Sequence, residues 1–168
     1  MNPYSAMIGR IQQQRADLEL VVNRAEQLLE KAKRSGDDGY IDGAALNLHG
    51  FYTGVENIFE DIARSADGEI PKGSDWHKQL LIQMSAEIPQ VRPQVIGHET
   101  RCCLEEYRSF RHIVRNVYTF RFRFSRVQEL VSELRACYDA VSSDLETFIL
   151  FLKKINKEDT LSVMPDIE

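Results

Sequence analysis

The sequence has few of the residues that make turns, and it has no long apolar run. Among its 168 residues, 9 are glycine and 5 are proline, which is too few for the many tight turns of an all-β sandwich or barrel. The longest purely apolar run, residues 148–152, is far shorter than the roughly 18 residues of a membrane span. The first residues also lack the apolar stretch of a secretory signal. We therefore expect a cytoplasmic protein that is neither inserted into a membrane nor exported.

Cysteine is scarce as well, and its pattern argues against a structural role. There are three cysteines, two of them are the neighbours Cys102 and Cys103, and no CxxC pair is present. Adjacent cysteines form at best a strained disulfide, and a zinc site needs spaced pairs of ligands. A reducing compartment is the simple interpretation.

The usual motifs of metal, nucleotide and hydrolase sites are also missing. A di-iron bundle needs a glutamate three residues before a histidine. The four histidines are instead preceded at that spacing by Leu46, Ser74, Val95 and Ser109. The sequence contains no HExxH, no glycine-rich phosphate loop and no GxSxG. Metal, nucleotide and hydrolase sites therefore have no support from sequence motifs. We expect neither a metal nor another cofactor.

What the sequence does have is helical periodicity over most of its length. Apolar residues recur every three or four positions, which is typical of amphipathic helices. The predicted helices cover about 4–33, 43–66, 74–88, 99–119 and 125–155. Long helices joined by short loops indicate an all-α, antiparallel helical bundle. We expect one domain over residues 1–155, followed by a flexible tail over 156–168.

One basic segment stands out in a chain whose net charge is −5. Residues 108–126 hold six arginines and one histidine, with no acidic residue among them. At 100° per residue, one arc of roughly 120° contains Arg108, Arg111, His112, Arg115 and Tyr118. The opposite side, which we expect to pack, contains Phe110, Ile113, Val114 and Val117.

This arrangement suits a phosphate-bearing ligand such as RNA. Guanidinium forks match phosphate oxygens, and interleaved aromatic rings suit unstacked bases. The alternative is a basic face that is merely solvated or paired with acids on neighbouring helices, and Glu105, Glu106 and Glu129 lie close by in the sequence. Composition alone leaves both interpretations open.

Within this segment, the run from Arg111 to Tyr118 (RHIVRNVY) resembles the Arg-x4-His-x-Tyr motif of HepT-like HEPN-domain proteins, with asparagine in the histidine place. The resemblance extends to the helix around Leu46–Glu56, to the run Asp75–His77 and to Arg92-Pro93, and it spans about residues 10–155. It implies an all-α homodimer that cuts RNA without metal in a cleft between its two chains. It also implies an MntA-like nucleotidyltransferase antitoxin that adds AMP to the motif tyrosine.

The resemblance implies a role for each matching residue. Arg111 would stabilise the scissile phosphate, and Tyr118 would be the AMP acceptor. Asn116 stands where the general base belongs, and asparagine cannot titrate. Because His112 shares a helical face with Arg108 and Arg115, it is our candidate for a relocated base.

The remaining assignments complete the predicted site. In an active enzyme, Arg115 would join Arg111 at the phosphate and Asn116 would position the ribose phosphate. Further RNA contacts are assigned to Arg108, Arg121 and Arg123. Positions 111 and 116 lie about 140° apart on an ideal helix. They would therefore converge only through a kink or through two chains, which makes a homodimer part of the hypothesis.

Three functions remain open at this point. The first is a metal-independent endoribonuclease of a toxin–antitoxin module. The second is a catalytically degenerate HEPN dimer that binds RNA, a nucleotide or a nucleotidyltransferase without cleavage. The third is phosphotransfer through His49, which the bulky Phe51 and Tyr52 argue against because a docking partner prefers small neighbours. The sequence assigns only packing or capping to His77.

Overall fold

The computed structural model describes residues 3–116 and 124–161, and all regular elements within them are helices. In chain order they are α1 (Pro3–Ser35), α2 (Gly39–Ile62), the π-helical turn η1 (Ala63–Asp67), α3 (Trp76–Ser85), α4 (His98–Asn116) and α5 (Phe124–Leu161). Five α-helices packed as a bundle confirm the predicted fold class.

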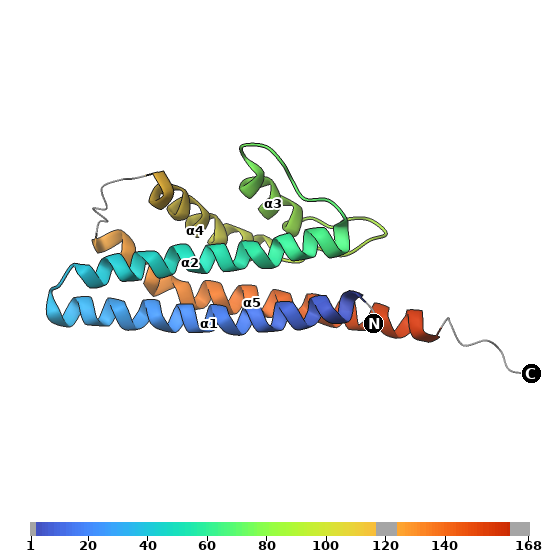
Figure 1. Cartoon of the computed structure of the whole chain (residues 1–168), viewed down its shortest axis with the longest axis horizontal. Coiled ribbons are helices and arrows are strands. Elements are labelled where there is room, and N and C mark those ends of the chain that lie inside the picture. The colour runs from blue at the N-terminus through green and yellow to red at the C-terminus, as the bar shows by residue number, and fades with distance from the viewer. Residues whose placement is uncertain (1–2, 117–123, 162–168) are drawn as a thin grey trace, which may run out of the picture.

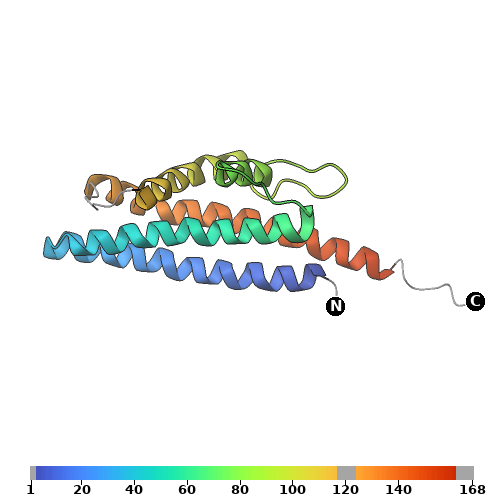
Figure 2. The same cartoon turned by 45° about the horizontal axis from the view of Figure 1, so that its top comes forward.

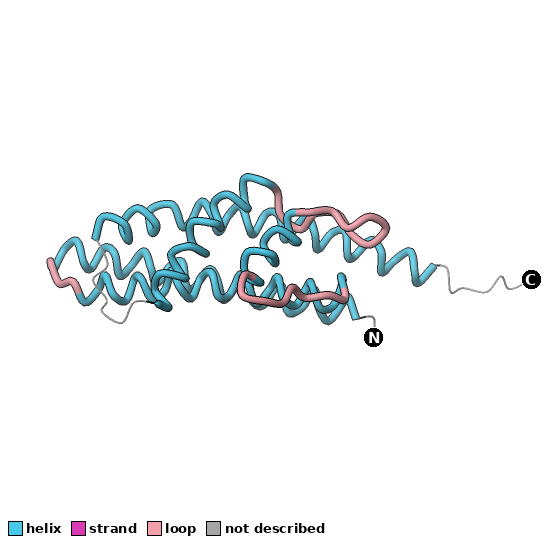
Figure 3. Tube along the Cα trace, turned by 90° about the horizontal axis from the view of Figure 1, so that it is seen from above, coloured by secondary structure: helices cyan, strands magenta, loops and turns pink. Residues whose placement is uncertain are grey.

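The bundle is built around three long helices (Figure 1). α1 and α2 form a long antiparallel hairpin, and α5 lies beside them in the same direction as α2. The shorter α3 and α4 cover the side of α2 that faces away from α1, as the turned view shows (Figure 2). Seen from above, the two longest loops lie before and after the short α3, whereas the loop between α1 and α2 lies at the far end of their hairpin (Figure 3). Within the described ranges, no helix has the length and apolar character needed to cross a membrane.

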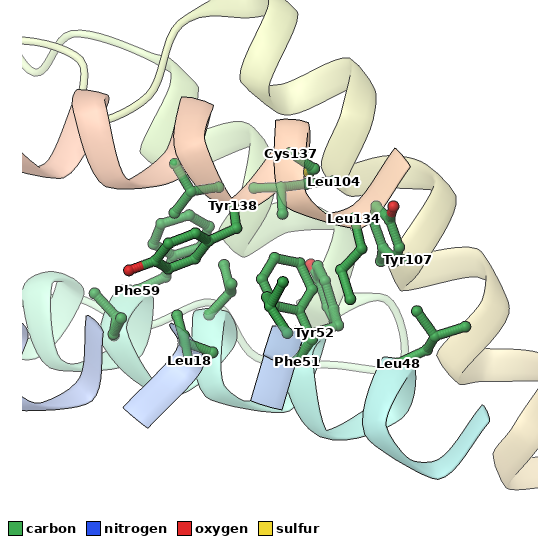
Figure 4. Close-up of a cluster of buried hydrophobic side chains, with 14 of the residues drawn as sticks. Leu18, Leu48, Phe51, Tyr52, Phe59, Leu104, Tyr107, Leu134, Cys137 and Tyr138 are labelled. Carbon is green, nitrogen blue, oxygen red and sulfur yellow. The ribbon is translucent and has the colours of Figure 1, made fainter. Parts of the chain in front are cut away.

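The core forms where α1, α2, α4 and α5 meet (Figure 4). The apolar stripe predicted for the first helix is buried there, including Ile11, Leu18 and Val22. α1 and α2 approach so closely that a Cβ on Gly54 would lie 2.6 Å from Leu18 Cδ2. Glycine therefore allows these two helices to share one tight interface.

Aromatic side chains tie α4 into this core. The rings of Phe51 and Tyr107 meet edge to face at 5.4 Å between centroids, an arrangement that adds to the stabilisation from burial. The Tyr107 hydroxyl donates a hydrogen bond of 2.7 Å to the backbone carbonyl of Leu130 in α5. The buried phenol therefore has its polar group satisfied, and α4 is fixed against both α2 and α5.

Several element boundaries differ from the predicted ones. α3 ends at Ser85 rather than near residue 88, because Ile88 pairs with the backbone of Arg92 across a tight turn. Gln90 in this turn has a φ of 65°. α5 continues to Leu161, six residues beyond the predicted end of the helix, and residues 162–168 lie outside the described part.

A buried ion pair fixes the region around α3. Arg92 and Asp67 are 1% and 2% exposed, and Arg92 donates to both carboxylate oxygens over 2.5 and 2.8 Å. The remaining guanidinium hydrogen bonds reach the carbonyls of Gln83, Ala86 and Pro93. One side chain thus joins η1, the end of α3 and the following loop, and so it holds α3 against α2.

The start of α4 is fixed by α5. The Asp144 carboxylate accepts the backbone N–H of Gly97 over 2.9 Å and the Thr100 hydroxyl over 2.6 Å. A carboxylate at a helix N-terminus satisfies otherwise unpaired N–H groups and complements the helix dipole. The loop between α3 and α4 is therefore held at both ends, by the hydrogen bonds of Arg92 and by those of Asp144.

We predict that Arg92→Met destabilises the protein strongly. The substitution leaves the Asp67 carboxylate buried without its partner, which costs about 3–5 kcal/mol. The free energy of unfolding from urea titration measures this loss. The control is Arg135→Met, because the Arg135–Glu26 pair is about 40% exposed and such pairs contribute only about 0–1 kcal/mol. Equal losses in the two variants would contradict the role assigned to Arg92.

A second ion pair makes stability depend on pH. Arg10 of α1 donates to both carboxylate oxygens of Asp61 in α2, each over 2.8 Å. The hydrogen bonds from Arg10, aided by the Ser65 hydroxyl, lower the pKa of Asp61 below its ordinary value despite partial burial. Because the folded-state pKa is the lower one, this stabilisation is present above the unfolded-state pKa of about 4 and is lost as the pH falls below it.

We predict that Asp61→Asn is less stable than the parent protein at pH 7 and that the gap narrows as the pH falls from about 5 to 3. Urea titrations at a series of pH values measure the two free energies of unfolding. A gap that stayed constant over this range would show that the Asp61 charge does not contribute.

Candidate functional site

The site is built on α4, whose sequence places arginines beside its buried stripe. Leu104, Tyr107 and Phe110 are buried at helical spacing, so the helix has a fixed rotation against α2. Arg111 follows this stripe directly and reaches back to α2. Its Nη1 donates to Oε1 of Glu56 over 2.5 Å, and the two side chains are 13% and 5% exposed.

A tyrosine ring supports the same guanidinium. The Arg111 guanidinium carbon lies 5.9 Å from the centroid of the Tyr52 ring, within the range of a cation–π contact. Burial, together with the nearby Glu56 carboxylate, raises the pKa of Tyr52, so its phenol stays protonated. Arg111 is thus held between a carboxylate and an aromatic face, both from α2.

Glu56 has a second partner on a third helix. Its Oε2 lies 2.7 Å from Nδ1 of His77, the second residue of α3. The His77 ring packs on Trp76, with 3.7 Å between the ring centroids. Each oxygen of this one buried carboxylate therefore takes a partner from a different helix, and α2, α3 and α4 meet at Glu56.

A small pocket opens beside this cluster. It has a volume of about 40 Å³ and is lined by His77, Arg108, Arg111 and His112. That volume accommodates about three water molecules or the oxygens of a phosphate group. Two arginines and two histidines line one cavity, and their guanidinium and imidazole groups are of the kind that binds phosphate and transfers protons near neutral pH.

The charges of both arginines are already compensated within the chain. Arg108 Nε donates to Glu105 Oε2 over 2.8 Å, and Arg111 is paired with Glu56. Arg126 pairs with Glu106 and Glu129. Acids pair with these arginines, as the alternative interpretation of the basic segment allowed, and they include all three glutamates that lie close by in the sequence. A guanidinium carries five N–H donors, and the pairs of Arg108 and Arg111 use one donor each.

The structure brings together three of the residues predicted from the sequence. Arg108, Arg111 and His112 all line the pocket, and His112 is exposed to solvent. Ile113, expected on the packed side, is 55% exposed, so the apolar face of α4 is narrower than predicted.

Other predicted residues lie outside the described part of the chain. The backbone at positions 115 and 116 is helical, but the side chains of Arg115 and Asn116 are not described. Tyr118, Arg121 and Arg123 fall in 117–123, which is likewise outside the described residues. Their predicted roles therefore stay predictions.

Sequence reasoning missed Glu56 and gave His77 only a packing or capping role. The signal for Glu56 was present, because it lies four residues after Tyr52 and three before Phe59 on the buried face of α2. A lone acid within an apolar stripe is rarely fully buried unless it is paired. No comparable signal in the sequence connects position 56 with position 77.

Two other histidines lie away from this pocket. His98 is exposed at the first position of α4, with Nε2 3.5 Å from Cys102 Sγ. His49 is half-buried on α2. Across residues 3–116 and 124–161, no three histidine, cysteine or acidic side chains are grouped as metal ligands.

The fold and the pocket define a helical bundle with a cluster of arginine and histidine side chains on one face. A family model described as HepT-like protein matches residues 43–152, well over half of the chain. The chain therefore belongs to the HepT-like family. The match includes the three helices that meet at Glu56. No curated protein and no solved structure gives a significant match.

We predict that Glu56→Gln lowers the free energy of unfolding by about 3–5 kcal/mol, because it leaves the buried Arg111 guanidinium without a counter-charge. The control is Glu87→Gln, since Glu87 is exposed and such a change costs at most about 0.5 kcal/mol. Adding Arg111→Met to Glu56→Gln should restore part of the loss. Urea titration of all four proteins measures these differences, and a small effect of Glu56→Gln would contradict the role of this carboxylate.

Proposed function

We propose that this protein is a metal-independent endoribonuclease of a HepT-like toxin–antitoxin module. The observation that carries the proposal is the pocket that Arg108 and Arg111 line together with His77 and His112. Family membership supports it. Arginine and histidine together supply both requirements of metal-free RNA cleavage, which are charge stabilisation at phosphorus and proton transfer.

The chemistry divides among these groups as follows. The ribose 2′-oxygen attacks the adjacent phosphorus, and the bond from phosphorus to the 5′-oxygen breaks. The products are a 2′,3′-cyclic phosphate and a 5′-hydroxyl. Arg111 and Arg108 stabilise the negative charge of the pentacoordinate phosphorus. His112, the histidine that the sequence selects, is one of the two imidazoles available for proton transfer.

The remaining predicted residues extend this site. Arg115 adds to the phosphate contacts, Asn116 positions the ribose phosphate, and Arg121 and Arg123 bind the RNA strand. Tyr118 is the acceptor of AMP, the modification by which the antitoxin switches the enzyme off. The proposed partners are a second copy of this chain and an MntA-like nucleotidyltransferase antitoxin.

A second candidate is a degenerate HEPN dimer that binds RNA or a nucleotidyltransferase without cutting. Two observations favour it. Asn116 stands in the histidine place of the family motif, and the charges of Arg108 and Arg111 are already balanced by acids of the same chain. The two candidates differ in one measurable property, which is cleavage of RNA in the absence of metal.

We predict that the purified protein cleaves RNA in the presence of EDTA. Arg111→Ala should slow the reaction by roughly 10²–10³-fold, because it removes a donor to the phosphorus oxygens. His112→Ala should slow it by about 10²–10⁴-fold through the lost proton transfer. The measurement is the rate of product formation from total RNA and from tRNA. Arg135→Ala, an arginine of α5 paired with α1, is the matched control and should retain the parent rate.

Each outcome decides between the candidates. Cleavage that Arg111→Ala abolishes supports the ribonuclease. No cleavage by a protein whose intact mass shows no AMP contradicts it and favours the binding module. If the mass shows AMP, the Tyr118→Phe variant, which cannot accept the group, should cleave RNA, and its inactivity would also contradict the ribonuclease.

A further inference from the structure

The pair formed by Glu56 and His77 has the geometry of a carboxylate that orients a catalytic imidazole. Glu56 Oε2 and His77 Nδ1 are 2.7 Å apart. An ionised carboxylate can only accept hydrogen bonds, so we assign the proton of this bond to Nδ1. The neutral ring then carries its lone pair on Nε2, which is the atom that can take a proton from a substrate.

The position of the ring suits this task. The His77 side chain is 24% exposed, so it contacts the buried carboxylate and also lines the pocket. Packing on Trp76 fixes the plane of the ring. A histidine that served only to cap α3 would need neither a buried carboxylate nor access to a cavity that two arginines share.

The same carboxylate also fixes the geometry between base and phosphate. Oε1 of Glu56 accepts from Arg111, while Oε2 pairs with His77. The imidazole and the guanidinium are therefore held at a set separation by one rigid planar group. Orienting a base and a phosphate ligand in this way lowers the entropic part of a reaction barrier.

We infer that His77 is the general base of the cleavage reaction and that Glu56 is its positioning residue. This inference rests on the proposed ribonuclease function. Nε2 of His77 takes the proton of the ribose 2′-hydroxyl as the 2′-oxygen bonds to phosphorus. The bond from phosphorus to the 5′-oxygen breaks, and that oxygen takes a proton from the His112 imidazolium. The positive charge that develops on His77 faces Glu56, as in other carboxylate–histidine pairs.

This assignment explains how the reaction can proceed with asparagine at position 116. The lost motif histidine is replaced by one that comes from another helix and is brought to the pocket by the tertiary fold. His112 keeps a role in proton transfer, but it acts on the leaving group. Both imidazoles are then required, each in a different protonation state.

The test is chemical rescue with imidazole. Cleavage of a labelled oligoribonucleotide in EDTA is measured for the wild type, His77→Ala and His98→Ala, with and without added imidazole. His77→Ala should be slower by about 10²–10⁴-fold, and imidazole should restore part of the rate. A histidine with a purely structural role would not respond to imidazole. His98→Ala, an exposed position away from the pocket, should keep the parent rate in both conditions.

The possible failures are distinguishable. A wild type that cuts no RNA, free of AMP, overturns the proposed function and this inference with it. Cleavage that persists in His77→Ala at the parent rate overturns only the role of His77. A rate that is lost but is not restored by imidazole also overturns it, provided that helicity and thermal midpoint match those of the wild type.

A second measurement does not depend on RNA or on the folding of a variant. Nitrogen-15 spectra of the wild-type imidazoles report which ring nitrogen carries the proton. The Nδ1-protonated tautomer of His77 in the neutral ring supports the inference. The Nε2-protonated tautomer would overturn it, because that ring has no lone pair to offer the pocket.

Discussion

The site depends on one buried carboxylate. Glu56 accepts a hydrogen bond from Arg111 on α4 and pairs with His77 on α3. Without this carboxylate, the Arg111 guanidinium and the His77 imidazole would lie in a region largely shielded from water with no counter-charge between them. A buried ion pair contributes little net stability, but losing one partner is costly. The sequence thus keeps a group whose main effect is to fix the arrangement of its two neighbours.

Other contacts of the fold position α3 and α4, and with them His77 and Arg111. The Arg92–Asp67 pair joins η1 to the end of α3, and Asp144 holds the start of α4. Burial of Tyr107 and its hydrogen bond to α5 set the rotation of α4. A pocket of about 40 Å³ tolerates little displacement, because reacting groups must be placed to within a fraction of an ångström.

The proposed reaction places its base on a different helix from the one that carries the motif resembling that of HepT-like proteins. Asn116 of α4 stands in the histidine place of that motif, whereas the inferred base, His77, lies on α3. A sequence motif does not connect the two residues, since positions 77 and 111 are separated by most of two helices and the loop between them. Their connection comes from the contact of both residues with the same carboxylate.

The sequence by itself determined the all-α class, the five helices and the shared face of Arg108, Arg111 and His112, because periodicity and helical spacing are local properties. It misplaced Ile113 and the end of α3, whose exposure and pairing depend on the surrounding tertiary structure. Only the tertiary structure decided that Glu56 neutralises Arg111 and that His77 joins them. The physical reason is that ion pairing and cavity formation depend on distances between helices, which the linear order of residues does not encode.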